Sequence, residues 1–370
     1  MRRSLAVVLT LPLLVAPAAG ASSPVGSSAR NSDGVALLRD PGSVVRAAEV
    51  ALSPGATRLA TDRYAMVGAT WQGSAPTVAV RTAPGEPWRE LAELADGPSV
   101  GEGEGLPGTG ATDLVWTGPD RGLEVRVTGT GFRDLELVLI DPGRLPGDEA
   151  APGVRRTPRT AEATEPDRAP RPVMRSRKDW DADPSWRNGR PRYNDRLKQV
   201  HVHHTATGNG YSRADVPAIL RGMYRYHTHN LGWFDIGYNF LVDRFGRAWV
   251  GRSGGPSRLV RGAHTLGFNH TSVGIAMIGN LEGRRPWKPA VRILARVAAW
   301  KLDKHGRDAV GKVRVRSTGS DKYAEGERPR LPVIDGHRDT NDTACPGQKL
   351  YDRLPKIRRR AQARIDRFDP

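Results

Sequence analysis

Two short motifs in the C-terminal half of the chain carry side chains that bind transition metals. His337 and Cys345 lie eight residues apart in GHRDTNDTACPG, and Cys345 is the single cysteine among 370 residues. His203 and His204 lie far upstream, in VHHTAT. Two imidazoles and one thiolate leave the fourth position of a tetrahedral zinc ion open, which catalytic zinc requires and structural zinc avoids.

The positions of these residues suit a shared ion. The VHHT motif ends a predicted strand, so His203 and His204 point to opposite faces and only one of them can reach the metal. His337 and Cys345 flank a short loop that a Pro-Gly step closes, so both can reach one ion. A mixed imidazole and thiolate set suits zinc better than magnesium or calcium.

A thiol hydrolase is the alternative chemistry for the same residues. It would use Cys345 as nucleophile and His337 as base, which requires an activated thiolate. The Pro-Gly step after the cysteine favours a metal loop. A chelator separates the two readings, because it abolishes a zinc activity and leaves a thiol activity intact.

The N-terminus predicts export from the cytoplasm. Residues 1–21 have the features of a signal peptide: Arg2 and Arg3, an apolar run over Leu5–Ala16 and an A-x-A cleavage site at Ala19–Ala21. The apolar run is too short to span a bilayer comfortably, and no other long apolar stretch follows. We therefore expect a secreted protein with no membrane span, located outside the cell or in the cell wall.

The formal net charge of +17 admits several partners. Nucleic acid and an anionic wall polymer are both compatible with a strongly basic chain. The basic residues are spread along the sequence and no long basic run stands out. We expect no nucleic-acid partner, and we keep anionic wall polymers as a possible one.

The composition changes along the chain divide it into segments. Residues 22–43 are small and polar and are expected to be disordered. Residues 44–143 alternate short apolar stretches with Gly/Pro/Asp turns, which predicts a small all-β domain, a sandwich, with a helix only at its start, over Val44–Leu52. Residues 144–172 have the Pro- and Arg-rich composition of a linker. Residues 173–368 interleave predicted strands and helices, which indicates an α/β domain that should fold without the first.

The α/β domain resembles the zinc-dependent N-acetylmuramoyl-L-alanine amidases of the peptidoglycan recognition protein family, in what looks like an actinobacterial two-domain form. The resemblance covers about half of the chain and rests on segments that occur in the family's order. These are SRKDWDAD, VHHTAT, GWFDIGYNFLVD, GRAWVGR, GAHTLGFNHTSVGIAMIGN and GHRDTNDTACPG. It implies a mixed β-sheet flanked by helices, with a zinc ion in a cleft.

The resemblance also implies roles for seven residues. His203, His337 and Cys345 match the zinc ligands, which leaves His204 to pack behind the site. Tyr238 and Thr343 match catalytic positions, and His264 and Asn269 match positions that line the substrate groove. The cysteine favours catalysis, because relatives that only bind peptidoglycan usually carry serine there.

The expected function is therefore that of a secreted zinc hydrolase. It would cleave the amide bond between N-acetylmuramic acid and L-alanine, with a muropeptide as substrate and a monomer as the active form. Bound zinc would lower the pKa of water to about 7 and so provide the nucleophile. The alternative is a non-catalytic peptidoglycan-binding module that keeps a residual zinc site.

Overall fold

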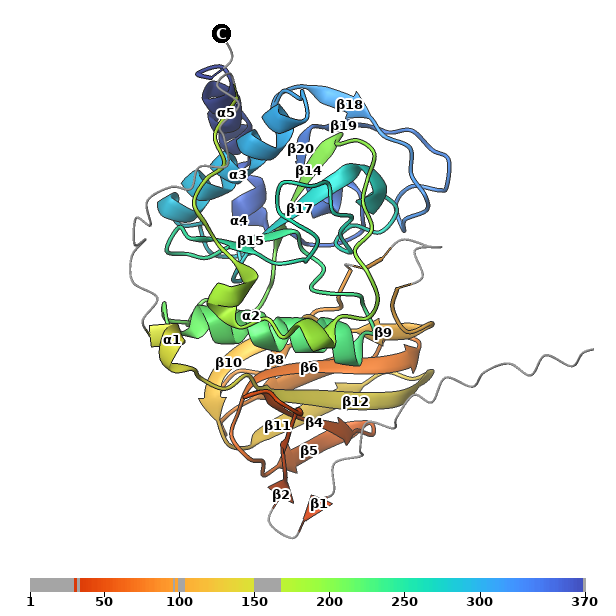
Figure 1. Ribbon diagram of the computed structural model, residues 1–370. Helices are drawn as coiled ribbons and strands as arrows, with labels where there is room; N and C mark the ends of the chain where they lie inside the picture. The colour runs from red at the N-terminus through yellow and green to blue at the C-terminus, as the bar shows by residue number, and fades with distance from the viewer. Residues whose placement is uncertain (1–29, 32–33, 96, 99–103, 150–167, 369–370) are drawn as a thin grey trace, which may run out of the picture.

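The computed structural model describes residues 30–31, 34–95, 97–98, 104–149 and 168–368. Figure 1 shows β-strands of the N-terminal region in the lower half, a second sheet in the upper half, and helix α2 (Asp215–Arg225) between them. The expected signal peptide and most of the expected linker, residues 150–167, lie outside the described residues.

The N-terminal region is a sandwich of two antiparallel sheets, as predicted. One sheet has the strand order β10-β6-β12-β4-β3, with β9 paired to β6, and the other has the order β5-β11-β7-β8. In β11 the residues Leu123, Val125 and Val127 are buried, whereas the alternate positions are more exposed, as expected for a strand with one face on the core. The strands are β1 (Arg30–Asn31), β2 (Gly34–Val35), β3 (Leu38–Arg39), β4 (Arg46–Ala51), β5 (Gly55–Leu59), β6 (Tyr64–Gly73), β7 (Thr77–Arg81), β8 (Arg89–Glu90), β9 (Thr109–Ala111), β10 (Val115–Asp120), β11 (Leu123–Thr128) and β12 (Phe132–Asp141).

Two expectations for the start of this region differ from the structure. Residues 34–43, expected to be disordered, contain β2 and β3, and Val35 and Leu37 are buried in the sandwich core. The predicted helix over Val44–Leu52 is strand β4, which pairs with β3 on one side and β12 on the other. Pairing on both edges outweighs the helix propensity of its alanines.

The α/β domain contains a six-stranded mixed sheet with the order β13-β16-β15-β17-β14-β20. The three neighbours β15, β17 and β14 run parallel, and β20 continues the parallel set beside β14. Strands β15 and β16 form an antiparallel pair. The strands are β13 (Met174–Arg175), β14 (Gln199–His204), β15 (Phe240–Val242), β16 (Ala248–Val250), β17 (Ser272–Met277), β18 (Lys312–Arg314), β19 (Arg330–Pro332) and β20 (Ile334–Gly336).

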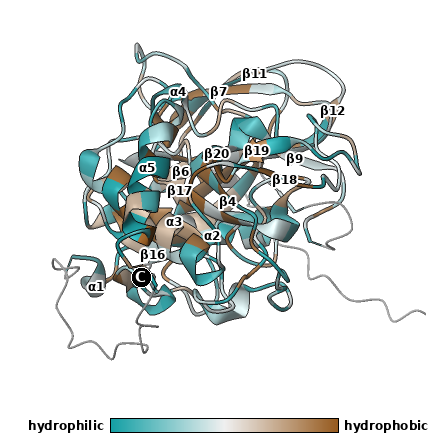
Figure 2. Ribbon diagram, turned by 90° about the horizontal axis from the view of Figure 1, so that it is seen from above, coloured by the Kyte–Doolittle hydropathy of each residue, from teal (hydrophilic) through white to brown (hydrophobic). Residues whose placement is uncertain are grey.

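Helices cover both faces of this mixed sheet. A core of aliphatic side chains separates one face from α3 and α5, and a second core separates the other face from α2. Figure 2 shows the hydrophobic colour gathered toward the centre and the hydrophilic colour at the periphery. Among the described residues, no helix has both the length and the apolar character needed to cross a bilayer. The remaining α-helices are α1 (Pro146–Glu149), α3 (Lys288–Lys304), α4 (Gln348–Tyr351) and α5 (Leu354–Ile365).

Helix α2 joins the two regions through one continuous core. All its residues are buried. Its apolar side chains pack with Met66 of β6 and Ile140 of β12 on one side and with the mixed sheet on the other. Two arginines of α2 form ion pairs with carboxylates of the N-terminal region. Arg221 pairs with Asp148 at 2.6 Å, and Arg225 pairs with Asp40 of the β3–β4 turn and Glu49 of β4. The structure therefore argues against a second domain that folds independently of the first.

Candidate metal centre

Strand register brings His203 and His337 to the same level of the mixed sheet. β14 and β20 run parallel, and Val202 pairs with Gly336. His203 follows Val202 along β14, and His337 follows Gly336 directly after β20. Cys345 returns to them because the N–H of Arg338 donates a hydrogen bond to the Cys345 carbonyl at 2.9 Å, which closes the intervening loop.

The three predicted ligands meet in the structure. Donor atoms of His203, His337 and Cys345 all lie within 4.8 Å of one another. Cys345 Sγ is 3.7 Å from His203 Nδ1, and the centroids of the two histidine rings are 4.7 Å apart. The N–H of His204 donates to Cys345 Sγ at 3.4 Å, and a donor in this position stabilises a thiolate.

This donor set fits a zinc ion. Zn–N and Zn–S bonds of about 2.1 and 2.3 Å place two tetrahedral ligands roughly 3.6 Å apart, close to the 3.7 Å between His203 Nδ1 and Cys345 Sγ. Burial lowers the pKa of His203 well below its usual value, and the neighbouring His201 lowers it further. The ring is therefore neutral, which is the state that binds a metal.

The two residues matched to catalytic positions lie beside the ligands. The ring of Tyr238 is buried, with its centroid 5.4 Å from that of His203. Thr343 is half-buried, and its hydroxyl oxygen accepts a hydrogen bond from the N–H of Cys345 at 3.2 Å. His204 is buried, and its Nδ1 accepts from the N–H of Leu281 at 3.2 Å.

His264 and Asn269, expected to line the groove, have different places. Both side chains are 0% exposed. His264 Nδ1 lies 3.1 Å from Nε2 of the ligand His203, so His264 supports the centre from behind. The Asn269 side chain accepts from the N–H groups of His264 and Thr265, and its Nδ2 donates to the Gly97 carbonyl of the N-terminal region at 2.9 Å.

A buried contact between an imidazole and a carboxylate, which the sequence did not predict, lies next to the centre. His201 Nδ1 lies 2.6 Å from Asp335 Oδ1, and Gln199 donates to the other carboxylate oxygen at 2.8 Å. Burial raises the pKa of Asp335 to about 6, although His201 opposes the shift. The sequence contained a signal that His201 lies near the centre, because His201 and His203 are two residues apart in a strand and so share one face.

A pocket of about 510 Å³ opens at the centre. His337, Thr343 and Cys345 line it on the side of the mixed sheet. Residues of the N-terminal β-sandwich also line it, which no residue pattern predicted. The residues that line the pocket are Ala92, Glu93, Leu94, Ala95, Asp113, His204, Ala206, Asn280, Glu282, Asp321, His337, Asp342, Thr343, Ala344 and Cys345.

These features define a mixed-sheet α/β domain with a His/His/Cys centre at the ends of its parallel strands. The family model described as Amidase_2, N-acetylmuramoyl-L-alanine amidase, matches residues 193–348. Peptidoglycan-recognition protein SC1a of Drosophila melanogaster is 32% identical over 158 residues, which are 43% of this chain and 72% of that protein. The chain therefore belongs to the family of N-acetylmuramoyl-L-alanine amidases and peptidoglycan recognition proteins, as the resemblance predicted.

Two further comparisons describe the extent of the likeness. The N-acetylmuramoyl-L-alanine amidase of Homo sapiens is 33% identical over 188 residues, which are 50% of this chain and 28% of the human protein. The solved structure of wild-type Drosophila PGRP-LB covers 49% of this chain and 92% of its own, at 27% identity and a TM-score of 0.39. Membership of the family supports peptidoglycan binding or amidase activity for this chain.

Proposed function

We propose that the chain is a zinc-dependent N-acetylmuramoyl-L-alanine amidase, which hydrolyses the amide bond between N-acetylmuramic acid and L-alanine of peptidoglycan. The observation that carries the proposal is the convergence of Cys345, His203 and His337 at a pocket. Three protein ligands with an open side are the pattern of a catalytic zinc rather than a structural one.

The residues of the centre have distinct parts in this reaction. When bound by the three ligands, zinc would act as a Lewis acid that activates water and polarises a carbonyl oxygen. Tyr238, beside His203, donates a hydrogen bond to the oxygen on which negative charge develops. Thr343 lines the pocket and helps to move a proton to the departing amine of L-alanine.

The proposed site of action is outside the cell or in the cell wall, with the chain acting as a monomer. The N-terminal segment that predicts export is the support for this location. Cell fractionation with an antibody tests the location, and a chain retained in the cytoplasm contradicts it. Light scattering of the purified protein tests the monomer.

Digestion of purified peptidoglycan by the zinc-loaded protein is the direct test of the reaction. We expect mass spectrometry to show stem peptides with a new L-alanine N-terminus, and a chelator to stop their release. Release that continues in chelator but stops with a thiol-blocking reagent would indicate the thiol hydrolase. Binding to peptidoglycan without any release would indicate the non-catalytic module.

A further inference from the structure

The β-sandwich supplies one side of the candidate active-site pocket. Ala92–Ala95 follow strand β8, and Asp113 precedes strand β10. Together they form the β rim, which lines the same pocket as Cys345 and His337. A substrate that enters the pocket must therefore contact both regions of the chain.

The β rim has a fixed backbone. The N–H of Asp113 donates to the Ala92 carbonyl at 2.8 Å, and the N–H of Leu94 donates to the Ala111 carbonyl at 2.8 Å. Glu93 and Thr112 thereby face each other as an antiparallel bridge. Two hydrogen-bonded chain segments hold the Glu93 and Asp113 side chains at defined positions along the rim.

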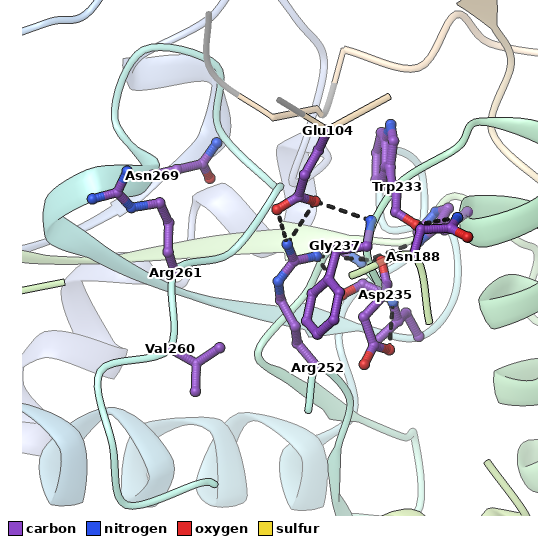
Figure 3. A network of polar contacts seen from close by, with 12 residues as sticks. Glu104, Asn188, Trp233, Asp235, Gly237, Arg252, Val260, Arg261 and Asn269 are labelled. Carbon is purple, nitrogen blue, oxygen red and sulfur yellow. Dashed lines mark hydrogen bonds and ion pairs between the residues drawn. The ribbon is translucent and has the colours of Figure 1, made fainter. Parts of the chain in front are cut away.

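Contacts of the described residues between Ala95 and Asp113 connect this part of the sandwich to the α/β domain. Glu104 makes a two-pronged ion pair with Arg252, with oxygen to Nη2 distances of 2.5 and 2.7 Å, and its carboxylate also accepts from the N–H of Phe234 (Figure 3). Arg252 is 3% exposed, so this pair is shielded from solvent. Asn269 adds its hydrogen bond to the Gly97 carbonyl.

The backbone completes the anchoring. The N–H groups of Gly105 and Leu106 donate to the carbonyls of Gly232 and Leu231 at 3.2 and 3.0 Å. In β10, the N–H of Trp116 donates to the carbonyl of Thr207 at 2.8 Å. Thr207 lies three residues after His204 in the sequence. These contacts tie segments that adjoin the β rim in the chain to the α/β domain.

The charged residues that line the pocket differ in type from those that predominate in the chain. Five carboxylates are among its described lining residues, and neither lysine nor arginine is. The chain as a whole carries +17. The five are Glu93, Asp113, Glu282, Asp321 and Asp342.

We propose that the β rim makes the β-sandwich a specificity element of the hydrolase, and that Glu93 and Asp113 favour muropeptides whose stem peptide carries a free ammonium group. The inference rests on the proposed function, because it names the substrate class of the same pocket. A stem peptide contains a diamino acid, whose side-chain amine is cationic when free and neutral once acylated by a crosslink. The acidic pocket therefore favours uncrosslinked stems.

A matched pair of soluble substrates tests the preference on the full chain. One is N-acetylmuramoyl-L-alanyl-γ-D-glutamyl-L-lysine, and the other is the same compound with its ε-amine acetylated. We expect kcat/KM to be two- to fivefold higher for the free amine, the size that one partly exposed ion pair gives. The ratio should fall toward one at 1 M salt, where such interactions are screened.

Glu93→Gln should reduce this ratio, and Glu93→Lys should invert it. Glu93 is exposed, so neither change disturbs packing. Asp113 also interacts with the Arg89 guanidinium, which makes Glu93 the cleaner position. Glu90→Gln is the matched control, because Glu90 is an exposed carboxylate of β8 that does not line the pocket. The control should keep the wild-type ratio.

Binding separates the two proposals. Calorimetry on the chelated full chain measures the Kd of both compounds without turnover, and we expect the same two- to fivefold preference there. Equal kcat/KM and equal Kd for the two compounds overturn the specificity inference and leave the amidase intact. Neither binding nor cleavage of either compound overturns the proposed function and the inference together.

Discussion

His264 Nδ1 lies 3.1 Å from His203 Nε2, while His203 Nδ1 faces Cys345 Sγ at 3.7 Å. One ring nitrogen of His203 is thus committed to His264 and the other to the metal centre. The arrangement requires the proton on Nε2 and the lone pair on Nδ1, the tautomer that a metal ligand needs. Glycines at positions 262 and 274 leave room for the His264 ring, since a Cβ at either would come within 2.4 Å of it.

The first prediction follows from this contact. His264→Ala should weaken zinc binding about 10- to 100-fold, the usual effect of removing a partner that orients a ligand. His264→Asn should restore most of the affinity, because its Oδ1 occupies the place of Nδ1 as acceptor. Competition with a chromophoric chelator measures both. The role assigned to His264 is wrong if the alanine variant binds zinc as the wild type does.

The candidate metal centre was readable from the sequence because its residues lie in short motifs. Strand alternation allowed only one of His203 and His204 to reach an ion, the family resemblance selected His203, and the loop spacing joined His337 to Cys345. The role of His264 was not readable, because its contact with His203 spans 61 residues and depends on how the segment before β17 folds back on the sheet. No local pattern encodes such a contact.

The sequence predicted most individual strands and helices of the fold, but not how the two regions of the chain pack against each other. Continuous apolar stretches in β6 and β12 indicated strands, and they are strands. Their second apolar face is covered by α2, which lies more than 70 residues later in the chain. Burial of Arg221 likewise depends on Asp148, a partner that no periodicity in α2 reveals.

The second prediction concerns the thiolate. Cys345→Ser should lose both zinc and activity, because a hydroxyl is a far poorer zinc ligand than a thiolate. Cys345 is 8% exposed and the substitution is nearly isosteric, so the fold should persist. Elemental analysis measures the zinc, digestion of peptidoglycan measures the activity, and circular dichroism checks the fold. A fully active serine variant would show that Cys345 is not a ligand of the centre.

The third prediction separates Tyr238 from the ligands. Tyr238→Phe should keep zinc and fold but lower kcat about 10²-fold or more, the scale of losing one oxyanion donor. Tyr193→Phe is a control, since the Tyr193 hydroxyl donates to the Gly254 carbonyl away from the pocket. Loss of zinc from the Tyr238 variant would show instead that the phenol supports the ligands.

The fourth prediction tests the shared core of the two regions. Asp148→Ala should destabilise the whole chain by about 3 kcal/mol, because it leaves the buried Arg221 guanidinium without its carboxylate. Glu149→Ala, at the exposed neighbouring position, should change stability by about 0.5 kcal/mol or less. Urea unfolding followed by tryptophan fluorescence measures both. Two separate unfolding transitions in the wild type would contradict a continuous core through α2.

The fifth prediction is a pH dependence that arises at Lys301 of α3. This side chain is 0% exposed, and its Nζ donates to the carbonyls of Pro256 and Arg258 at 3.1 and 2.9 Å. Burial lowers the pKa of Lys301 to about 7, with smaller effects from Lys304 and Arg171. In the unfolded chain the group titrates near its ordinary pKa of about 10.4.

The sign follows from proton uptake. Below about pH 7 both states carry the charge, and the folded state bears the full cost of its burial. Between pH 7 and about 10.4 the unfolded state binds more protons, so the free energy of unfolding rises with pH. Lys301→Met removes this cost, and its stability gain over the wild type should shrink by about 2–3 kcal/mol from pH 6 to pH 9.

Urea unfolding of wild type and variant at both pH values measures that change, and groups common to the two proteins cancel in the difference. Lys288→Met is the control, because Lys288 is exposed at the start of the same helix and its charge stays solvated in both states. A gain for Lys301→Met that is the same at pH 6 and pH 9 would mean that Lys301 stays charged in the folded protein. The two carbonyl acceptors would then stabilise an ammonium group within the core.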